Sequence, residues 1–225
     1  MVELIQSTHF VIKEIKVNSY GNLVVFSGID GSGKSTLCKK VFEFYSNRNC
    51  NVEYISAFED RIFINEYERI TNENIETSQH TSSEKIKNIA WLCDLVNNTL
   101  NILLPKLKSG TTLFVDRYTL CAKVYSLATT TSDISSLFSI YDILPKPDLC
   151  FYLDITPQLA IERIKERKGK RTYYENLYDL QKIQIQYERM IPYEDYQVKR
   201  IDTSKSEDII LAESLEFINE IMSLK

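Results

Sequence analysis

Five short apolar runs recur along the chain, and longer stretches of mixed character separate them. Continuous apolar runs of this length, without alternation, are typical of strands that are buried on both faces of a parallel sheet. We therefore predict five buried strands. They cover residues 22–27, 52–57, 111–116, 149–154 and 197–202.

Between these runs, apolar residues recur every three or four positions, which is the spacing of an amphipathic helix. The clearest helix is predicted over 85–107, and Pro105 is expected to kink or end it. Further helices are predicted over 157–168 and 206–224. Strands that alternate with helices predict an α/β fold, in which helices cover both faces of a parallel sheet.

The sequence contains no internal repeat, linker or low-complexity tract, so we predict a single domain over residues 1–225. Residues 1–21 precede the first strand as an N-terminal extension, and within it 9–17 fits either an edge strand or an amphipathic helix. Polar or mixed segments follow several strands, where folds of this class bind their substrates. These segments are 58–82, 129–145 and 168–180.

Composition narrows the class of partner. The 225 residues carry a formal net charge of −4, which argues against a surface for nucleic acid. Five cysteines without a Cys-x-x-Cys pair, and only two histidines, give little support to disulfides or to a metal cluster. No apolar run is long enough to cross a membrane and no signal pattern follows Met1, so we expect a cytoplasmic protein without a membrane partner.

The most specific motif lies at residues 28–36, which read Gly-Ile-Asp-Gly-Ser-Gly-Lys-Ser-Thr. This run fits Gly-x-x-x-x-Gly-Lys-Ser, the loop that cradles the phosphates of a nucleoside triphosphate. Its glycines let backbone N–H groups approach the phosphates, Lys34 reaches the terminal phosphates, and Ser35 holds Mg²⁺. The predicted triphosphate site consists of Gly28, Asp30, Gly31, Ser32, Gly33, Lys34, Ser35 and Thr36.

Asp116 and Arg117 stand at the end of the third predicted strand. A carboxylate there can bind Mg²⁺ through water beside a phosphate loop, and the planar guanidinium of Arg117 can grip a second phosphate. A simple ion pair at a strand end is the alternative. Asp30, inside the loop, fits either a hydrogen bond to a sugar hydroxyl or a solvated loop position.

A strongly charged run occupies residues 163–171, where seven of nine side chains are charged and six of those are basic. Gly169 could act as a hinge within it. The run fits a flap that closes over triphosphate and stabilises charge on the transferring group. It also fits a solvated helix end, which is how most charge runs resolve. We place the predicted lid at about residues 165–176.

These motifs, in this order, resemble the thymidylate kinase family of P-loop nucleoside monophosphate kinases. The similarity extends over about residues 22–205. It implies a P-loop kinase fold, transfer of the γ-phosphoryl group of ATP to dTMP with Mg²⁺, and a homodimer. The matching segments are 26–36, 115–118, 145–149 with 152–154, and the flap with Arg163, Arg167 and Arg171.

The resemblance also implies roles for single residues. Asp30 would contact the acceptor sugar, Arg117 and Arg61 the acceptor phosphate, and the flap arginines would close over ATP. The expected catalytic residues are Lys34, Asp116, Arg117, Arg167 and Arg171, with Ser35 and Asp116 at the metal. The expected acceptor residues are Asp30, Phe58, Arg61, Trp91, Arg117, Tyr118, Cys121 and Tyr125.

Departures from the family pattern fall on the acceptor side. Residues 57–61 read Ala-Phe-Glu-Asp-Arg in place of Arg-Phe-Pro-x-Arg, and the stretch 91–94 lacks the arginine that reads thymine. Cys121 replaces a serine. We therefore expect dTMP as the leading acceptor. The alternative is a related phosphotransferase that acts on a different nucleotide, nucleoside or specialised metabolite, and a regulatory P-loop NTPase is the alternative from another class.

Overall fold

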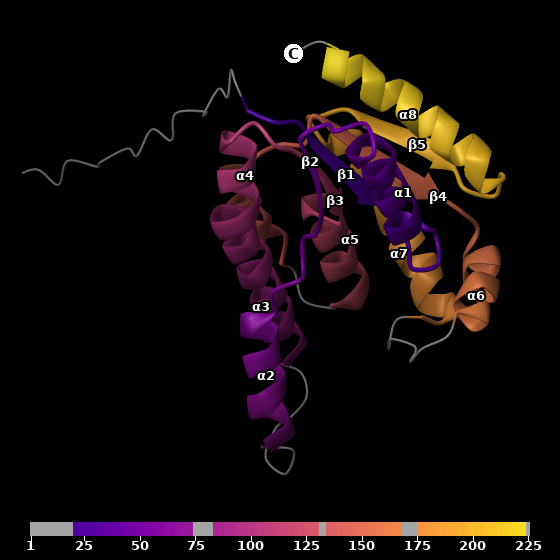
Figure 1. Cartoon of the computed structure of the whole chain (residues 1–225). Coiled ribbons are helices and arrows are strands. Elements are labelled where there is room, and N and C mark those ends of the chain that lie inside the picture. Colours follow the sequence, from indigo (N-terminus) through magenta and orange to yellow (C-terminus); the bar gives the residue numbers. More distant parts are fainter. Residues whose placement is uncertain (1–19, 74–82, 131–133, 168–174, 224–225) are drawn as a thin grey trace, which may run out of the picture.

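A parallel sheet of five strands forms the centre of the protein in a computed structural model, which describes residues 20–73, 83–130, 134–167 and 175–223 (Figure 1). The strand order is β2-β3-β1-β4-β5. All five predicted strands are confirmed. Their bounds are Leu23–Ser27 for β1, Val52–Ser56 for β2, Thr112–Asp116 for β3, Leu149–Asp154 for β4 and Val198–Asp202 for β5.

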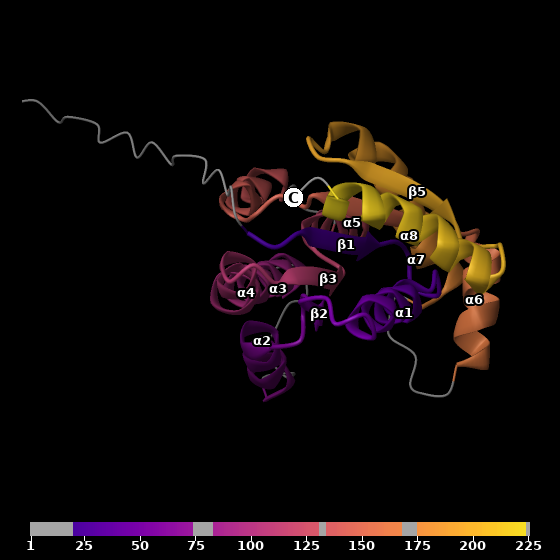
Figure 2. The same cartoon turned by 45° about the horizontal axis from the view of Figure 1, so that its top comes forward.

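Helices cover both faces of the sheet, as the alternating pattern predicts (Figures 1 and 2). Alternate residues of β1 face opposite cores: Val24 and Phe26 pack with α1 (Lys34–Ser46) and α8 (Glu207–Ser223). Leu23 and Val25 belong to the larger core on the other face. That core contains residues of α3 (Ser83–Asn98), α5 (Thr119–Thr129), α6 (Pro157–Glu166) and α7 (Leu177–Met190).

The helix predicted over 85–107 is one continuous helical run with a change of pitch. It comprises α3, a π-helical turn at Thr99–Leu103 and α4 (Leu104–Lys108). Pro105 does not end it, because this proline lies in the first turn of α4, directly after the wider π-helical turn. The wider π-helical turn before it interrupts the regular α-helical hydrogen-bond pattern, and this accommodates the ring and the missing N–H of the proline.

The remaining helices lie in or beside segments that the sequence pattern left without regular structure. They are α2 (Ile62–Glu73), a 3₁₀-helix at Ser135–Ile143 and a short 3₁₀ turn at Ile191–Tyr193. Figure 1 shows α2 and α3 side by side, projecting away from the sheet. In the part of the chain that the structure covers, no helix combines the length and apolar character needed to span a membrane.

Candidate functional site

The phosphate loop, residues 28–33, connects β1 to α1 at the carboxyl edge of the sheet. Gly31 has a φ of +82°, and a Cβ there would lie 2.5 Å from the carbonyl oxygen of Ala160. A Cβ on Gly28, with φ +148°, would lie 2.7 Å from the carbonyl oxygen of Leu153. Both positions therefore require glycine, since a side chain would have nowhere to go.

Lys34 lies buried beneath the loop, with 4% of its side chain exposed. Its Nζ donates a hydrogen bond to the Ile29 carbonyl oxygen at 2.7 Å and lies 3.8 Å from Oδ1 of Asp30. Burial lowers the pKa of Lys34 and so does Arg117, while Asp30 and Asp116 act in the opposite direction. A cation held in this way faces the space where the loop would place phosphate oxygens.

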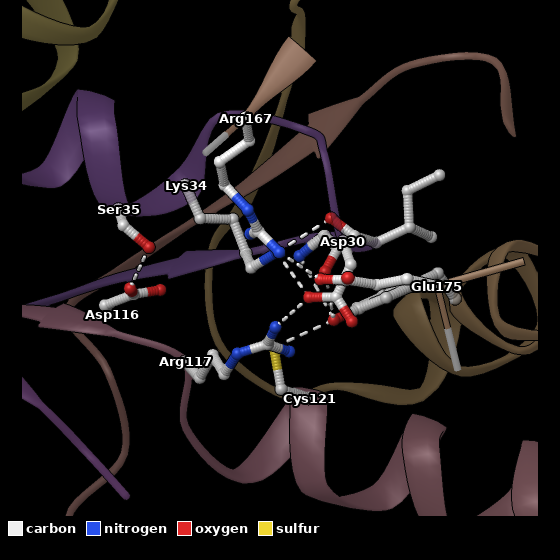
Figure 3. Close-up of polar contacts among 11 residues, drawn as sticks. Asp30, Lys34, Ser35, Asp116, Arg117, Cys121, Arg167 and Glu175 are labelled. Carbon is white, nitrogen blue, oxygen red and sulfur yellow. Dashed lines mark hydrogen bonds and ion pairs between the residues drawn. The ribbon is translucent and has the colours of Figure 1, made fainter. Parts of the chain in front are cut away.

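Ser35 and Asp116 meet because β1 and β3 are neighbours in the sheet. Asp116 pairs with Phe26 across the two strands, and the Ser35 hydroxyl donates to its Oδ2 at 2.5 Å (Figure 3). The other carboxylate oxygen, Oδ1, is buried and has no hydrogen-bond partner among the described residues. A hydroxyl beside a carboxylate with a free oxygen is a donor set that suits Mg²⁺.

Arg117 turns toward the phosphate loop and forms an ion pair with Asp30. Its backbone adopts a φ of +67°, and its guanidinium lies 5.0 Å from the ring centre of Tyr125. Burial tends to raise the pKa of Asp30, but Arg117 and Lys34 outweigh it and bring the value to about 2. Asp30 is thus a largely buried anion between two cations, with 14% of its side chain exposed, and a solvated loop position is excluded for it.

Two cavities meet at this pair of residues. The loop cavity, about 550 Å³, is lined by residues 30–37 and by basic side chains that include Arg163, Arg167 and Lys205. The aromatic cavity, about 430 Å³, lies between α3 and α5. Asp30 and Arg117 line both cavities, so two ligands, one in each, would meet at the same charged groups.

The aromatic cavity gathers seven of the eight expected acceptor residues. They are Asp30, Phe58, Arg61, Trp91, Arg117, Cys121 and Tyr125. Phe58 and Trp91 contact edge to face, with ring centres 5.5 Å apart, and the Arg61 guanidinium lies 4.7 Å from the Trp91 ring centre. Tyr118 lies elsewhere: it is buried in the core, and its hydroxyl donates to the carbonyl oxygen of Pro145 at 3.1 Å.

Asp94 and Asn98, which the sequence did not single out as site residues, hold the wall that carries Phe58 and Arg61. The Asp94 carboxylate accepts from two consecutive backbone N–H groups, those of Phe63 at 2.9 Å and Ile64 at 3.0 Å, in the first turn of α2. Asn98, one turn along α3, donates to the carbonyl oxygens of Ala57 and Asp60. The sequence did contain a signal for these two residues, because Asp94 and Asn98 are polar side chains four residues apart on the apolar face of the predicted helix.

The predicted lid is only partly within the described residues, since 168–174 and therefore Arg171 lie outside them. Arg163 donates to the carbonyl oxygen of Thr203 at 2.7 Å. Arg167, at the end of α6, pairs with the buried carboxylate of Glu175 at 2.5 Å. Both arginines line the loop cavity, so the basic run does reach the phosphate loop at this end.

Comparisons with known proteins agree with these motifs. A family model described as thymidylate kinase matches residues 26–213. The chain is 34% identical to the thymidylate kinase of Leptospira borgpetersenii over 200 residues, which cover 86% of this chain and 91% of the relative. It is 28% identical over 215 residues to a protein of Methanosarcina mazei named probable thymidylate kinase, covering 89% of this chain and 98% of the relative.

Proposed function

Because the chain belongs to the thymidylate kinase family, we propose that it transfers the γ-phosphoryl group of ATP to the 5′-phosphate of dTMP, giving ADP and dTDP. The observation that carries this proposal is the meeting of the two cavities at Asp30 and Arg117. ATP in the loop cavity and dTMP in the aromatic cavity would bring their phosphates together there. Such positioning, with charge neutralisation, is the main source of catalysis in phosphoryl transfer.

On the donor side, the loop N–H groups and Lys34 hold the phosphates of ATP. The buried ammonium of Lys34 stabilises negative charge more strongly than it would in water, because few water molecules screen it. Arg163 lines the same cavity and adds positive charge, and Arg167, which also lines it, would add its charge when it exchanges Glu175 for a phosphate. We extend the same role to Arg171, whose place in the sequence supports it.

Ser35 and Asp116 are the residues that would hold Mg²⁺. The unpartnered Oδ1 of Asp116 and the adjacent Ser35 hydroxyl supply the hard oxygen ligands that this ion prefers. When bound, Mg²⁺ neutralises charge on the phosphates of ATP. Asp116 also fixes the orientation of the Ser35 hydroxyl, so the two residues act as one unit.

On the acceptor side, Arg117 and Arg61 hold the phosphate of dTMP, and Asp30 with Tyr125 contacts its sugar. Phe58 and Trp91 provide the apolar surface for the base. Arg61 rests against Trp91 and lies 4.0 Å from Glu68, so it must turn along the cavity wall to reach the phosphate. Cys121 closes the cavity on the α5 side, where its thiol lies 2.8 Å from the hydroxyl of Tyr187.

We further propose that the protein is a cytoplasmic homodimer with one domain per chain. All five cysteines are free, which suits a reducing compartment. Large apolar side chains are exposed on the neighbouring helices α2 and α3 and on the π-helical turn that follows α3. They include Phe63 with 46%, Ile86 with 52% and Leu100 with 41% of their surface exposed. A second copy that packs against these helices would bury them.

A coupled ADP-release assay with ATP and Mg²⁺ tests the proposed reaction. The acceptors are dTMP, dUMP, UMP, dCMP, CMP, AMP, GMP and the free nucleosides. Turnover that is fastest with dTMP and is lost in Lys34→Met supports the proposal. Faster turnover with another acceptor would assign a different kinase, and ADP release that needs no acceptor would indicate an NTPase.

A further inference from the structure

Four residues of α3 line the aromatic cavity: Glu84, Lys87, Asn88 and Trp91. Their spacing of three or four residues places them along one side of the helix. None of them is an arginine, so α3 itself offers no guanidinium to read the edge of a base that stacks on Trp91.

The edge of thymine makes a specific demand on such a group. Its N3–H is a donor and the adjacent O4 is an acceptor, so a matching side chain must accept and donate side by side. A carboxylate such as Glu84 only accepts, and an ammonium such as Lys87 only donates. Among these four residues, Asn88 alone carries both functions, in its Oδ1 and its NH₂ group.

The side-chain amide of Asn88 is also available to bind a ligand. It is partly buried, and its amide makes no hydrogen bond within the described residues. Other asparagines of the same helical run differ: Asn98 donates to two carbonyl oxygens, and Asn101 donates to Asn97 at 2.8 Å. Asn88 precedes Trp91 by three residues, so the two side chains lie on the same side of α3, and both line the aromatic cavity.

We propose that Asn88 is the base-reading residue of the acceptor site. Its Oδ1 accepts from N3–H of thymine and its Nδ2 donates to O4, while the ring stacks on Trp91. This inference rests on the proposed function, because it assigns a specificity contact to dTMP in the aromatic cavity. An amide has thereby taken over a recognition task that the family is expected to give to an arginine.

The test compares dTMP with N3-methyl-dTMP, which cannot donate from N3, at saturating ATP. The enzymes are wild type, Asn88→Ala, Asn88→Asp and the control Lys87→Gln, which changes a neighbouring cavity residue. Wild type should prefer dTMP strongly. In Asn88→Ala the KM for dTMP should rise about 10- to 100-fold and the preference over N3-methyl-dTMP should fall by a similar factor.

Asn88→Asp should raise the KM for dTMP further, because its carboxylate would face O4, although it preserves the shape of the side chain. In all variants the KM for ATP should stay unchanged, which a general disturbance of the fold would not allow. Fluorescence of Trp91, the one tryptophan of the chain, gives dTMP affinity independently of turnover.

The outcomes separate two failures. If wild type phosphorylates dTMP but Asn88→Ala keeps its KM and its preference, Asn88 does not read the base. If Lys87→Gln loses the preference as well, the effect does not belong to the amide of Asn88 and the assignment is wrong. If wild type ignores dTMP and phosphorylates another acceptor, the proposed function itself fails.

Discussion

The hydroxyl of Tyr187 contacts both backbone polar groups of Gly28, the first glycine of the phosphate loop. It accepts from the Gly28 N–H at 3.1 Å and donates to the Gly28 carbonyl oxygen at 3.2 Å. Tyr187 is fully buried in α7, and its ring stacks on Tyr152 with 5.0 Å between ring centres. The entry to the phosphate loop is therefore fixed by a helix that lies far away in the sequence.

Replacement of Tyr187 by phenylalanine should leave the start of the phosphate loop, at Gly28, less firmly held. The change leaves two buried backbone groups without a partner, which lowers the free energy of unfolding by about 1–3 kcal/mol. The KM for ATP should rise severalfold, as the loop amides lose their alignment. Urea denaturation and ATP titration measure the two effects.

Tyr45→Phe is the matched control for that experiment. The Tyr45 hydroxyl also donates one hydrogen bond, to Asn219 at 2.7 Å, but on the opposite face of the sheet. This variant should lose stability without a change in the KM for ATP. An unchanged KM in Tyr187→Phe as well would show that the loop holds its shape without the tyrosine.

The phosphate loop was predicted from the sequence, whereas Tyr187, which holds its first glycine, was not. The strands, the loop and Asp116 follow from local patterns, because burial and phosphate binding leave their mark on adjacent residues. Tyr187 and Asp94 act on backbone groups 159 and 30 residues away, and no local pattern encodes such contacts. Helix α2 escaped prediction because its first residues, Ile62 and Phe63, are apolar yet exposed, which blurs the helical period.

Asp94→Asn should weaken the acceptor side selectively. An amide can accept from only one of the two N–H groups that the carboxylate satisfies, and it loses the attraction between the anion and the helix N-terminus. We expect the free energy of unfolding to fall by about 1–3 kcal/mol. Because α2 adjoins the segment with Phe58 and Arg61, the KM for dTMP should rise while that for ATP does not.

The control for Asp94 is Asn97→Ala on the same helix. Among the described residues, the Asn97 side chain accepts a hydrogen bond from Asn101 at 2.8 Å, and this bond is exposed to solvent. The Asn97→Ala variant should keep the free energy of unfolding and the KM values for ATP and dTMP near those of wild type. If Asp94→Asn raises both KM values equally, its effect is on the whole fold and the positioning role is wrong.

Ile86→Lys should break the proposed dimer. A lysine that is buried in an apolar interface loses the hydration of its ammonium group, and this free-energy cost exceeds what the surrounding contacts contribute to association. The same lysine on the surface of a monomer stays hydrated. Light scattering after gel filtration should give a dimer for wild type and a monomer for the variant. Ile209→Lys, at an equally exposed isoleucine on α8, should remain dimeric. A monomeric wild type would contradict the assembly.

Asp30 should make the free energy of unfolding depend on pH in the acidic range. Its pKa in the folded protein is about 2, below the ordinary 3.8, because Arg117 and Lys34 outweigh burial. The ionised carboxylate therefore stabilises the fold above about pH 4, by about 2 kcal/mol, and this contribution is lost as pH falls toward about 2. Asp30→Asn should be less stable than wild type near neutral pH, and the difference should shrink below about pH 4.

Urea denaturation from about pH 2.5 to 7 would follow that difference. A gap between wild type and Asp30→Asn that stays constant across the acidic range would mean that Asp30 does not titrate there. The same low pKa implies that Asp30 stays ionised throughout the neutral range, so it should add no step to the pH dependence of kcat.

Ser35 and Asp116 should govern the requirement for Mg²⁺. Ser35→Ala removes the hydroxyl that donates to Asp116, and Asp116→Asn removes the negative charge and an acceptor oxygen. Either change should raise the Mg²⁺ concentration for half-maximal rate about tenfold or more, because one hard oxygen ligand or its orientation is lost. Ser35→Thr retains the hydroxyl and should restore most of the activity. If Ser35→Ala responds to Mg²⁺ as wild type does, the ion is held elsewhere, and the free oxygen of Asp116 needs another explanation.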